Sequence, residues 1–201
     1  ATKSNLQAHG VMEHPKVIAT PEMDVNEIGK QLLDAGVVQA PVVKSSDDMN
    51  LIGMISIADI LENFLNRNLK ARYQNVGEIK TKKVITCNYD DPISKVWDKM
   101  DEDGFSGLPV LKNKKIIGII TRKDIMNSGH VKISKEGGIK TSTKVESIMR
   151  TPPIVITPDK DIKEAAALMV KYNIGRLPVV DNPVYIKKEP ERAKEADLVG
   201  I

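Results

Sequence analysis

Cysteine and aromatic residues are scarce in this chain of 201 residues, and each scarcity excludes something. A single cysteine, Cys87, excludes an internal disulfide, so we expect a reducing, cytoplasmic setting. Aromatic residues make up only 3% of the chain. The core must therefore consist mainly of aliphatic side chains, and platforms on which exposed nucleic-acid bases could stack are few.

Long apolar runs and a strong net charge are also missing. No apolar run reaches the roughly 18 residues that a membrane helix needs, and no secretory leader opens the chain, so we expect a soluble protein without membrane contact. The formal net charge of +3 is too small to argue for nucleic acid by itself, although it permits an anionic ligand. With 41% hydrophobic residues, the chain can form one or two globular domains.

Sequence motifs of catalytic and metal sites are absent as well. The histidines His9, His14 and His130 are scattered without ligand spacing, which argues against a metal site. The chain contains no glycine-rich phosphate loop of the GxxxxGK[ST] or GxGxxG kind, and its motifs supply no pair of nucleophile and base. The sequence therefore predicts a protein that is not an enzyme and has no catalytic cofactor.

The most informative feature that is present is an internal repeat. Residues 118–124 read Gly-Ile-Ile-Thr-Arg-Lys-Asp, and residues 53–59 read Gly-Met-Ile-Ser-Ile-Ala-Asp. A third copy starts at Gly200, just before the last residue given. Each copy follows a Pro-apolar-apolar strand pattern, so whole units of the fold are repeated.

The order of patterns within a repeat predicts a strand, a helix, two antiparallel strands and a closing helix. In the first repeat, residues 17–20 form a short apolar run, and Asp24 with Glu27 is typical of a capped helix start. An amphipathic stripe follows and ends near Gly36. Two apolar runs at 40–43 and 51–55 then predict a hairpin, so the expected fold class is α/β (α+β).

Three repeats follow from this pattern. We expect an arm at residues 1–10, repeat 1 at 11–66, repeat 2 at 76–128, a linker at 129–144 and repeat 3 at 145–201. The linker lacks apolar periodicity and is predicted to be the domain boundary, so that repeats 1 and 2 form one module and repeat 3 is half of a second. A fourth repeat could follow repeat 3 in the full protein.

A charged segment interrupts the third repeat where the other repeats have a tight turn. Residues 182–197 carry four Lys or Arg and four Glu or Asp, without periodic apolar residues. The segment is therefore predicted to be a solvated, mobile loop that is dispensable for folding.

These patterns resemble the cystathionine beta-synthase (CBS) domain family, whose repeats combine a Val-rich first strand, an amphipathic helix, a Pro-Val-Val strand and Gly-apolar-apolar-[Ser/Thr]-x-x-Asp. The resemblance covers nearly all of residues 11–201. It implies that tandem CBS repeats pair through their sheets into a pseudo-twofold module, and that such modules form a homodimer. It also implies a non-catalytic regulatory function in which clefts between paired repeats bind adenosine compounds.

The resemblance assigns residues to these clefts. It implies ribose recognition by Asp59 and Asp124 and phosphate contact by Ser56 and Thr121, with Arg122 and Lys123 as added cations. A carboxylate can accept two hydrogen bonds from a diol, and a hydroxyl at a helix start can hold a phosphate, so the chemistry agrees. The implied adenine slots comprise Ile18, Thr20, Ala40 and Pro41 in one cleft, and Ile85, Cys87, Leu108 and Pro109 in the other.

Alternative interpretations remain open at this point. A hydroxyl followed three residues later by Asp is also a helix-capping pattern, and Cys87 can be a small buried apolar residue. The ligand could be AMP, ADP, ATP or S-adenosylmethionine. A nucleic-acid-binding or scaffolding protein that uses the basic connectors at 67–83 and 131–144 is the second hypothesis. The regulated target protein cannot be identified from the sequence.

Overall fold

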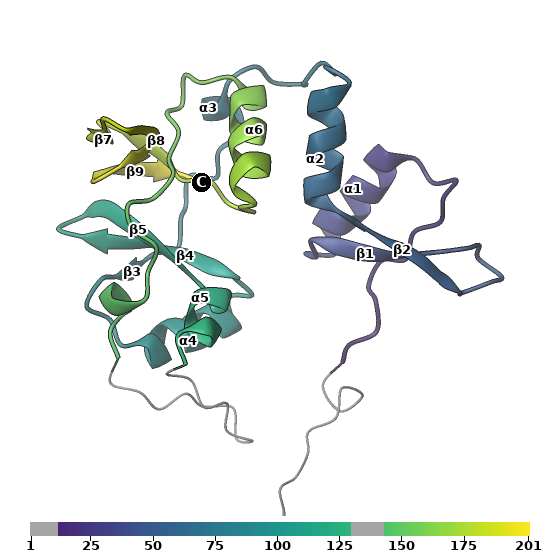
Figure 1. The fold of residues 1–201 in the computed structure, drawn as a ribbon, viewed down its shortest axis with the longest axis horizontal. Coiled ribbons are helices and arrows are strands. Elements are labelled where there is room, and N and C mark those ends of the chain that lie inside the picture. Colours follow the sequence, from purple (N-terminus) through teal and green to yellow (C-terminus); the bar gives the residue numbers. More distant parts are fainter. Residues whose placement is uncertain (1–11, 130–142) are drawn as a thin grey trace, which may run out of the picture. The chain divides into compact units, whose positions relative to one another are not determined.

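Helices and short strand pairs alternate along the chain in the computed structural model, which describes residues 12–129 and 143–201 (Figure 1). The described residues divide into two units. Unit 1 comprises those up to Lys70 with Val170–Asn173, and unit 2 comprises Ala71–Met169 with Ile174–Ile201, as far as they are described.

Unit 1 contains repeat 1, in the predicted order of elements. The elements are α1 (Val25–Asp34), β1 (Gln39–Val43), β2 (Leu51–Ser56) and α2 (Ile57–Asn66). The predicted first strand is reduced to a parallel bridge between Ala19 and Val42. Helix α1 starts where predicted, because the Asp24 carboxylate accepts hydrogen bonds from the backbone N–H groups of Asn26 and Glu27. Ile28 of α1 packs with Ala19 in the core.

Repeat 2 forms the first half of unit 2. Its elements are α3 (Val76–Ile79), β3 (Cys87–Asn88), α4 (Ile93–Glu102), β4 (Gly107–Lys112), β5 (Lys115–Thr121) and α5 (Arg122–Asn127). The apolar stripe of α4 is buried, with Ile93 and Met100 at 0% exposure. These side chains pack with Ile120 of β5 and Ile125 of α5, so the two helices and the strands share one core.

Repeat 3 completes unit 2. Its elements are a 3-10 turn (Val145–Ser147), α6 (Ile162–Tyr172, which extends into unit 1), β6 (Val179–Asp181), β7 (Tyr185–Ile186), β8 (Glu189–Ala193) and β9 (Ala196–Gly200). Repeats 2 and 3 share a sheet with the strand order β3-β4-β5-β9-β6. At its centre β5 and β9, which occupy the same place in their repeats, pair antiparallel.

A pseudo-twofold axis therefore relates repeats 2 and 3. The backbones of Ile119 and Arg150 exchange two hydrogen bonds, and those of Ile201 and Thr81 exchange the equivalent two. In each case the segment ahead of one repeat's first strand joins the third strand of the other repeat. This reciprocal exchange confirms, for unit 2, that paired repeats join through their sheets.

Repeat 2 pairs with a different repeat from the one that the sequence predicted. Repeat 2 was expected to pair with repeat 1, with a boundary at 129–144, but β5 pairs with β9 of repeat 3 and the two units divide near Lys70. The length of a connector does not indicate which repeats pair, because the entropic cost of closing a loop grows only slowly with its length. The linker residues 130–142 and the whole N-terminal arm at 1–10 lie outside the described residues.

The prediction that residues 182–197 form a solvated loop is also wrong. The segment contains the β7–β8 hairpin, the turn after it and the first two residues of β9. Ala193 and Ala196 have 0% and 1% exposure and pack in a core cluster with Ile116. Small alanine side chains, rather than a long apolar stripe, let this backbone pack on the sheet, which is why periodicity did not reveal it.

Candidate functional site

A cavity of about 270 Å³ lies between repeats 2 and 3 in unit 2. Its lining residues are Thr81, Lys83, Val84, Ile85, Phe105, Gly107, Leu108, Pro109, Arg176 and Ile201. One wall is apolar and comes from the first and second strand regions of repeat 2. The lining residues with polar side chains are Thr81, Lys83 and Arg176, and none of the lining residues is acidic.

Arg176 comes from repeat 3 and reaches across to repeat 2. Its Nη1 donates a hydrogen bond of 2.8 Å to the carbonyl oxygen of Gly107, and its guanidinium carbon lies 4.8 Å from the centre of the Phe105 ring. Burial lowers the pKa of Arg176. Among the ion pairs of the described residues none involves Arg176, so a partly buried cation faces the cavity without a carboxylate. Such a group favours an anionic ligand.

Three of the four residues predicted for this adenine slot line the cavity. Ile85, Leu108 and Pro109 do, whereas Cys87 lies in the core with its Sγ 3.8 Å from the carbonyl oxygen of Pro109. Burial raises the pKa of the Cys87 thiol to about 12, as expected for a packed apolar residue.

The sequence did not predict the charged residues of this cavity as site residues. Lys83 was placed in the basic connector at 67–83, and Arg176 lies in a repeat whose cleft was not considered. The available signal was the position of Arg176, two residues before Pro178, where repeat 2 has Gly107 before Pro109.

Thr121 and Asp124 form a complete capping box at the start of α5. The Asp124 Oδ2 accepts hydrogen bonds from the Thr121 hydroxyl and, at 3.0 Å, from the Thr121 backbone N–H. Its Oδ1 accepts a hydrogen bond of 2.7 Å from Arg150 Nε, and the Asp124 side chain is only 10% exposed. Both carboxylate oxygens are therefore already engaged.

The cations next to Thr121 differ in their surroundings. The Arg122 guanidinium donates hydrogen bonds to the carbonyl oxygens of Met100 and Phe105 and pairs with Asp101. It thus satisfies carbonyl groups at the end of α4, where a cation is also favoured by the helix dipole. Lys123 is exposed.

The site predicted for repeat 1 lies entirely in unit 1. Ser56 and Asp59 form a second capping box, with 2.7 Å between the Ser56 hydroxyl and Asp59 Oδ2. The implied slot residues surround the parallel bridge of the first strand: Ile18, Thr20 and Pro41 are half-buried, and Ala40 has 0% exposure. Asp59 is exposed, and no ion pair of the described residues involves it.

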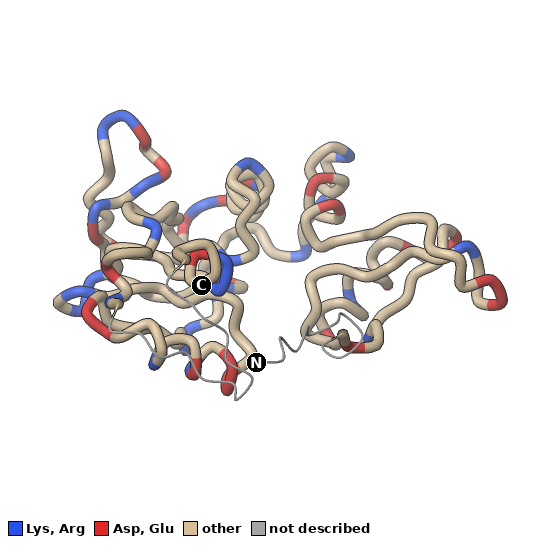
Figure 2. The backbone as a smooth tube through the Cα atoms, turned by 60° about the horizontal axis from the view of Figure 1, so that its bottom comes forward, with Lys and Arg blue, Asp and Glu red and all other residues tan. Residues whose placement is uncertain are grey.

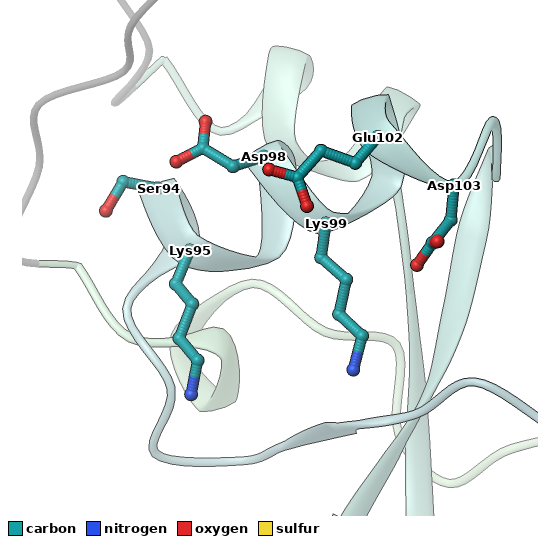
Figure 3. A pocket seen from close by; sticks show the side chains of 6 residues that line it. All are labelled: Ser94, Lys95, Asp98, Lys99, Glu102 and Asp103. Atoms are coloured by element: carbon teal, nitrogen blue, oxygen red, sulfur yellow. The ribbon is translucent and has the colours of Figure 1, made fainter.

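A larger hollow of about 520 Å³ follows the outer face of α4 (Figure 3). It is lined by Ser94, Lys95, Asp98, Lys99, Glu102 and Asp103, all from one helix and the residue after it. Lys95 pairs with Asp91, and Lys99 donates to the carbonyl oxygen of Thr86. All lining residues come from one helix and its end, so no second element encloses the hollow, and the lining charges are of both signs. This hollow is therefore a weaker candidate than the cavity at Arg176.

Metal-ligand groups and membrane-spanning helices are both absent from the described part of the chain. Residues 12–129 and 143–201 contain no group of three or more His, Cys, Asp or Glu side chains that could hold a metal ion. None of the helices in those ranges is both long and apolar enough to cross a membrane.

Comparison with known proteins identifies the repeats. The family model of the CBS domain matches residues 8–66, 76–130 and 145–186. Protein MJ0188 of Methanocaldococcus jannaschii is 34% identical over 128 residues, which are 63% of this chain and 40% of that protein. Inosine-5'-monophosphate dehydrogenase of Korarchaeum cryptofilum is 30% identical over 162 residues, 76% of this chain and 31% of the dehydrogenase. The chain thus spans less than half the length of these relatives.

A solved structure shares the fold over most of the chain. The crystal structure of protein MJ1225 from M. jannaschii superposes with a TM-score of 0.72 at 24% sequence identity, covering 92% of this chain and 66% of that one. The expected fold of tandem repeats is therefore confirmed.

Proposed function

Since the chain belongs to the CBS domain family, we propose that it is a regulatory, non-catalytic module that binds an adenine nucleotide, AMP, ADP or ATP, between repeats 2 and 3. The observation that carries the proposal is the cavity that combines an apolar wall with Lys83 and Arg176 and has no acidic lining residue. A base needs the apolar wall, and a phosphate needs the cations.

The charges at the cavity favour a phosphate over other adenosine ligands. Lys83 and Arg176 are both cations, and Arg176 has lost part of its hydration through burial. S-adenosylmethionine carries a positive sulfonium group, which these cations would repel. An adenine nucleotide supplies two or more negative charges in the same place, so it fits the cavity better.

Asp124, the residue that the resemblance assigns to the ribose, has a lesser part in this proposal. Thr121 and Arg150 already occupy its two carboxylate oxygens. A ribose could bind there only by displacing Arg150, at the cost of an ion pair. We therefore expect the cavity at Arg176 to bind ligand first. Ribose binding at Asp124 and at Asp59 remains a prediction.

Regulation would follow if nucleotide binds one arrangement of the repeats better than another. A ligand shifts a conformational equilibrium only by its difference in affinity for the two states. The relative from K. cryptofilum supports a regulatory function, because the segment similar to this chain is 31% of an enzyme with a separate named activity.

Calorimetry with AMP and adenosine on Arg176→Met tests the nucleotide proposal. Hydrogen bonds to charged groups contribute about 1.5 to 3 kcal/mol, so AMP affinity should fall about 10- to 150-fold. Adenosine lacks the phosphate, and its weaker binding should change less than about threefold. Lys187→Met, which removes an exposed cation elsewhere in unit 2, is the matched control. Equal AMP affinity in parent and Arg176→Met would contradict the assignment of Arg176.

Nucleic-acid binding is the second candidate. Figure 2 shows basic and acidic residues interspersed along the described backbone of both units, without a long stretch of one sign. Phosphate-backbone binding needs a continuous basic surface and weakens steeply with salt. Oligonucleotide binding that is lost between about 50 and 200 mM salt would support the nucleic-acid hypothesis, and binding that persists over this range would count against it. Competition by AMP would support the nucleotide site.

A further inference from the structure

The pseudo-twofold axis of unit 2 gives the cavity at Arg176 a counterpart on repeat 3. In each repeat a parallel bridge joins the first strand to the second. The bridge joins Cys87 to Val110 in repeat 2, and Ile156 to Val179 in repeat 3. This register matches each residue of repeat 2 that lines the cavity to a residue of repeat 3. The counterpart surface therefore lies within residues 150–154 and 174–178.

The cations of the cavity have no equivalents on the counterpart surface. Pro152 stands where repeat 2 has Lys83. Arg176 belongs by position to the counterpart surface, but its side chain turns away to repeat 2. There it donates to the carbonyl oxygen of Gly107 and lies over the Phe105 ring. One arginine thus faces two equivalent places, and it serves the cavity.

Repeat 2 supplies no cation in exchange, because the residue that matches Arg176 is Gly107. A Cβ atom at Gly107 would lie only 3.1 Å from the Thr121 side chain, so a longer side chain has no room there. Within residues 150–154 and 174–178, all of which are described, the other charged residue is Arg150. Its guanidinium already pairs with Asp124 at 2.7 Å. A phosphate therefore finds weaker attraction here than at the cavity.

The β7–β8 hairpin covers the counterpart surface. The backbone of Ile154 forms an antiparallel bridge with Arg192 of β8. Arg192 Nη1 also donates a hydrogen bond of 2.7 Å to the carbonyl oxygen of Pro152. Ile154 is 9% exposed, whereas its match Ile85 is half-buried and lines the cavity. The hairpin thus closes in repeat 3 a place that is open in repeat 2.

This hairpin is an addition to the repeat. Between β4 and β5 repeat 2 has only Asn113 and Lys114, whereas repeat 3 has residues 182–195 between β6 and β9. The match of the CBS domain model to repeat 3 ends at residue 186, so β8 lies beyond it. Membership of the family therefore does not account for β8.

We propose that the β7–β8 hairpin is a fixed cover over the counterpart surface, so that unit 2 binds nucleotide at the cavity alone. The two places are equivalent by fold, and the cover and the cations distinguish them. Because the cavity is the nucleotide site of the proposed function, this assignment rests on that function. A single site in unit 2 saturates without coupling between two ligands across the axis.

Cysteine accessibility compares the two places directly. Ile85→Cys and Ile154→Cys put a thiol at matched positions, and the parent measures the background from buried Cys87. Since a thiol reacts only where the reagent reaches it, Ile154→Cys should react with iodoacetamide at least about tenfold more slowly than Ile85→Cys. Melting curves check that both variants are folded. Equal rates in the folded variants would show that the counterpart surface is open and overturn the proposal.

Protection by AMP then reports each place separately, without interference from repeat 1. AMP at about ten times its dissociation constant leaves about a tenth of the sites free, so Ile85→Cys should react about tenfold more slowly. The rate of Ile154→Cys should not change. If AMP slows Ile154→Cys, as nucleotide binding at Asp124 would cause, the single site is wrong. If AMP slows neither variant, the proposed function itself fails, and the single site with it.

Removal of the hairpin tests its role as the cover. In Ile154→Cys, replacing residues 182–195 by Asn-Gly should raise the iodoacetamide rate at least about tenfold, because the reagent then reaches the thiol. Replacing only Lys187 and Lys188 at the exposed tip is the matched control and should leave the rate unchanged. Cys87, in the core of repeat 2, must stay unreactive, which shows that unit 2 is folded. An unchanged rate after removal of the hairpin would overturn its role.

Discussion

Replacing the hairpin segment 182–195 by a two-residue Asn-Gly turn should destabilise unit 2. The replacement removes β7 and β8 and leaves β9 in place. It deletes hydrogen bonds that hold the hairpin to the segment ahead of α6. The Glu191 carbonyl oxygen accepts from the Val155 N–H, and the Ala193 N–H donates to the Pro153 carbonyl oxygen. Arg192 Nη1 donates to the Pro152 carbonyl oxygen at 2.7 Å.

The expected magnitude follows from opposing effects. Three hydrogen bonds at about 1 kcal/mol each contribute about 3 kcal/mol. Loss of the buried Ala193 methyl group, and of its cover over Ile116, contributes about 1 kcal/mol more. The replacement also shortens the loop by nearly three halvings of its length, which lowers the entropic cost of closing the loop by about 2 kcal/mol. The net loss is about 2 to 3 kcal/mol, or roughly 4 to 12 °C in melting temperature.

Trp97 fluorescence is the appropriate assay, because this tryptophan packs against the core of repeat 2 within unit 2. The control replaces only Lys187 and Lys188, the exposed tip of the β7–β8 hairpin, by Asn-Gly. Its transition should stay within about 1 °C of the parent, as for other surface changes. If the large deletion melts like the control, the segment is dispensable and the packing argument fails.

Three further predictions concern the interior and the pH response of unit 2. Gly118→Val should lower its stability by at least about 2 kcal/mol in urea unfolding, because Arg150 and Met149 leave no room for a side chain; parent-like stability would refute the close approach. Hydrogen bonds from Asn182 and Lys115 lower the pKa of Asp197 below 3.8, so its carboxylate stabilises the fold above pH 3.8 and this contribution is lost as the pH falls through the lowered value. In Asp197→Asn the free energy of unfolding should therefore fall less steeply as the pH is lowered below 3.8. An unchanged pH dependence would count against the ion pair of Lys115 with Asp197. With its pKa raised to about 12, Cys87 should react with iodoacetamide at pH 8 much more slowly in the folded protein than in urea, and equal rates would show that the thiol is accessible.

The capping boxes of α2 and α5 show what local sequence can predict. Ser56 with Asp59 and Thr121 with Asp124 cap their helices as the three-residue spacing indicated. The same spacing could not decide whether the carboxylate is available to a ligand. Arg150, 26 residues from Asp124, donates a hydrogen bond to Asp124 Oδ1, and no residue near Asp124 in the sequence indicates this contact.

The sequence by itself determined the repeat family, the order of the helices and paired strands in repeats 1 and 2, and the helix starts at the capping boxes. These features depend on hydrogen bonds and periodicities that span a few residues, so they can be read locally. Only the tertiary structure decided that repeat 2 pairs with repeat 3, that Arg176 enters the cavity and that the charged segment packs as a hairpin. Lys115 and Asp197 are 82 residues apart, and all three repeats present an equivalent strand. A local pattern that every repeat shares cannot specify which two of them meet, because that choice depends on the complementarity of whole surfaces.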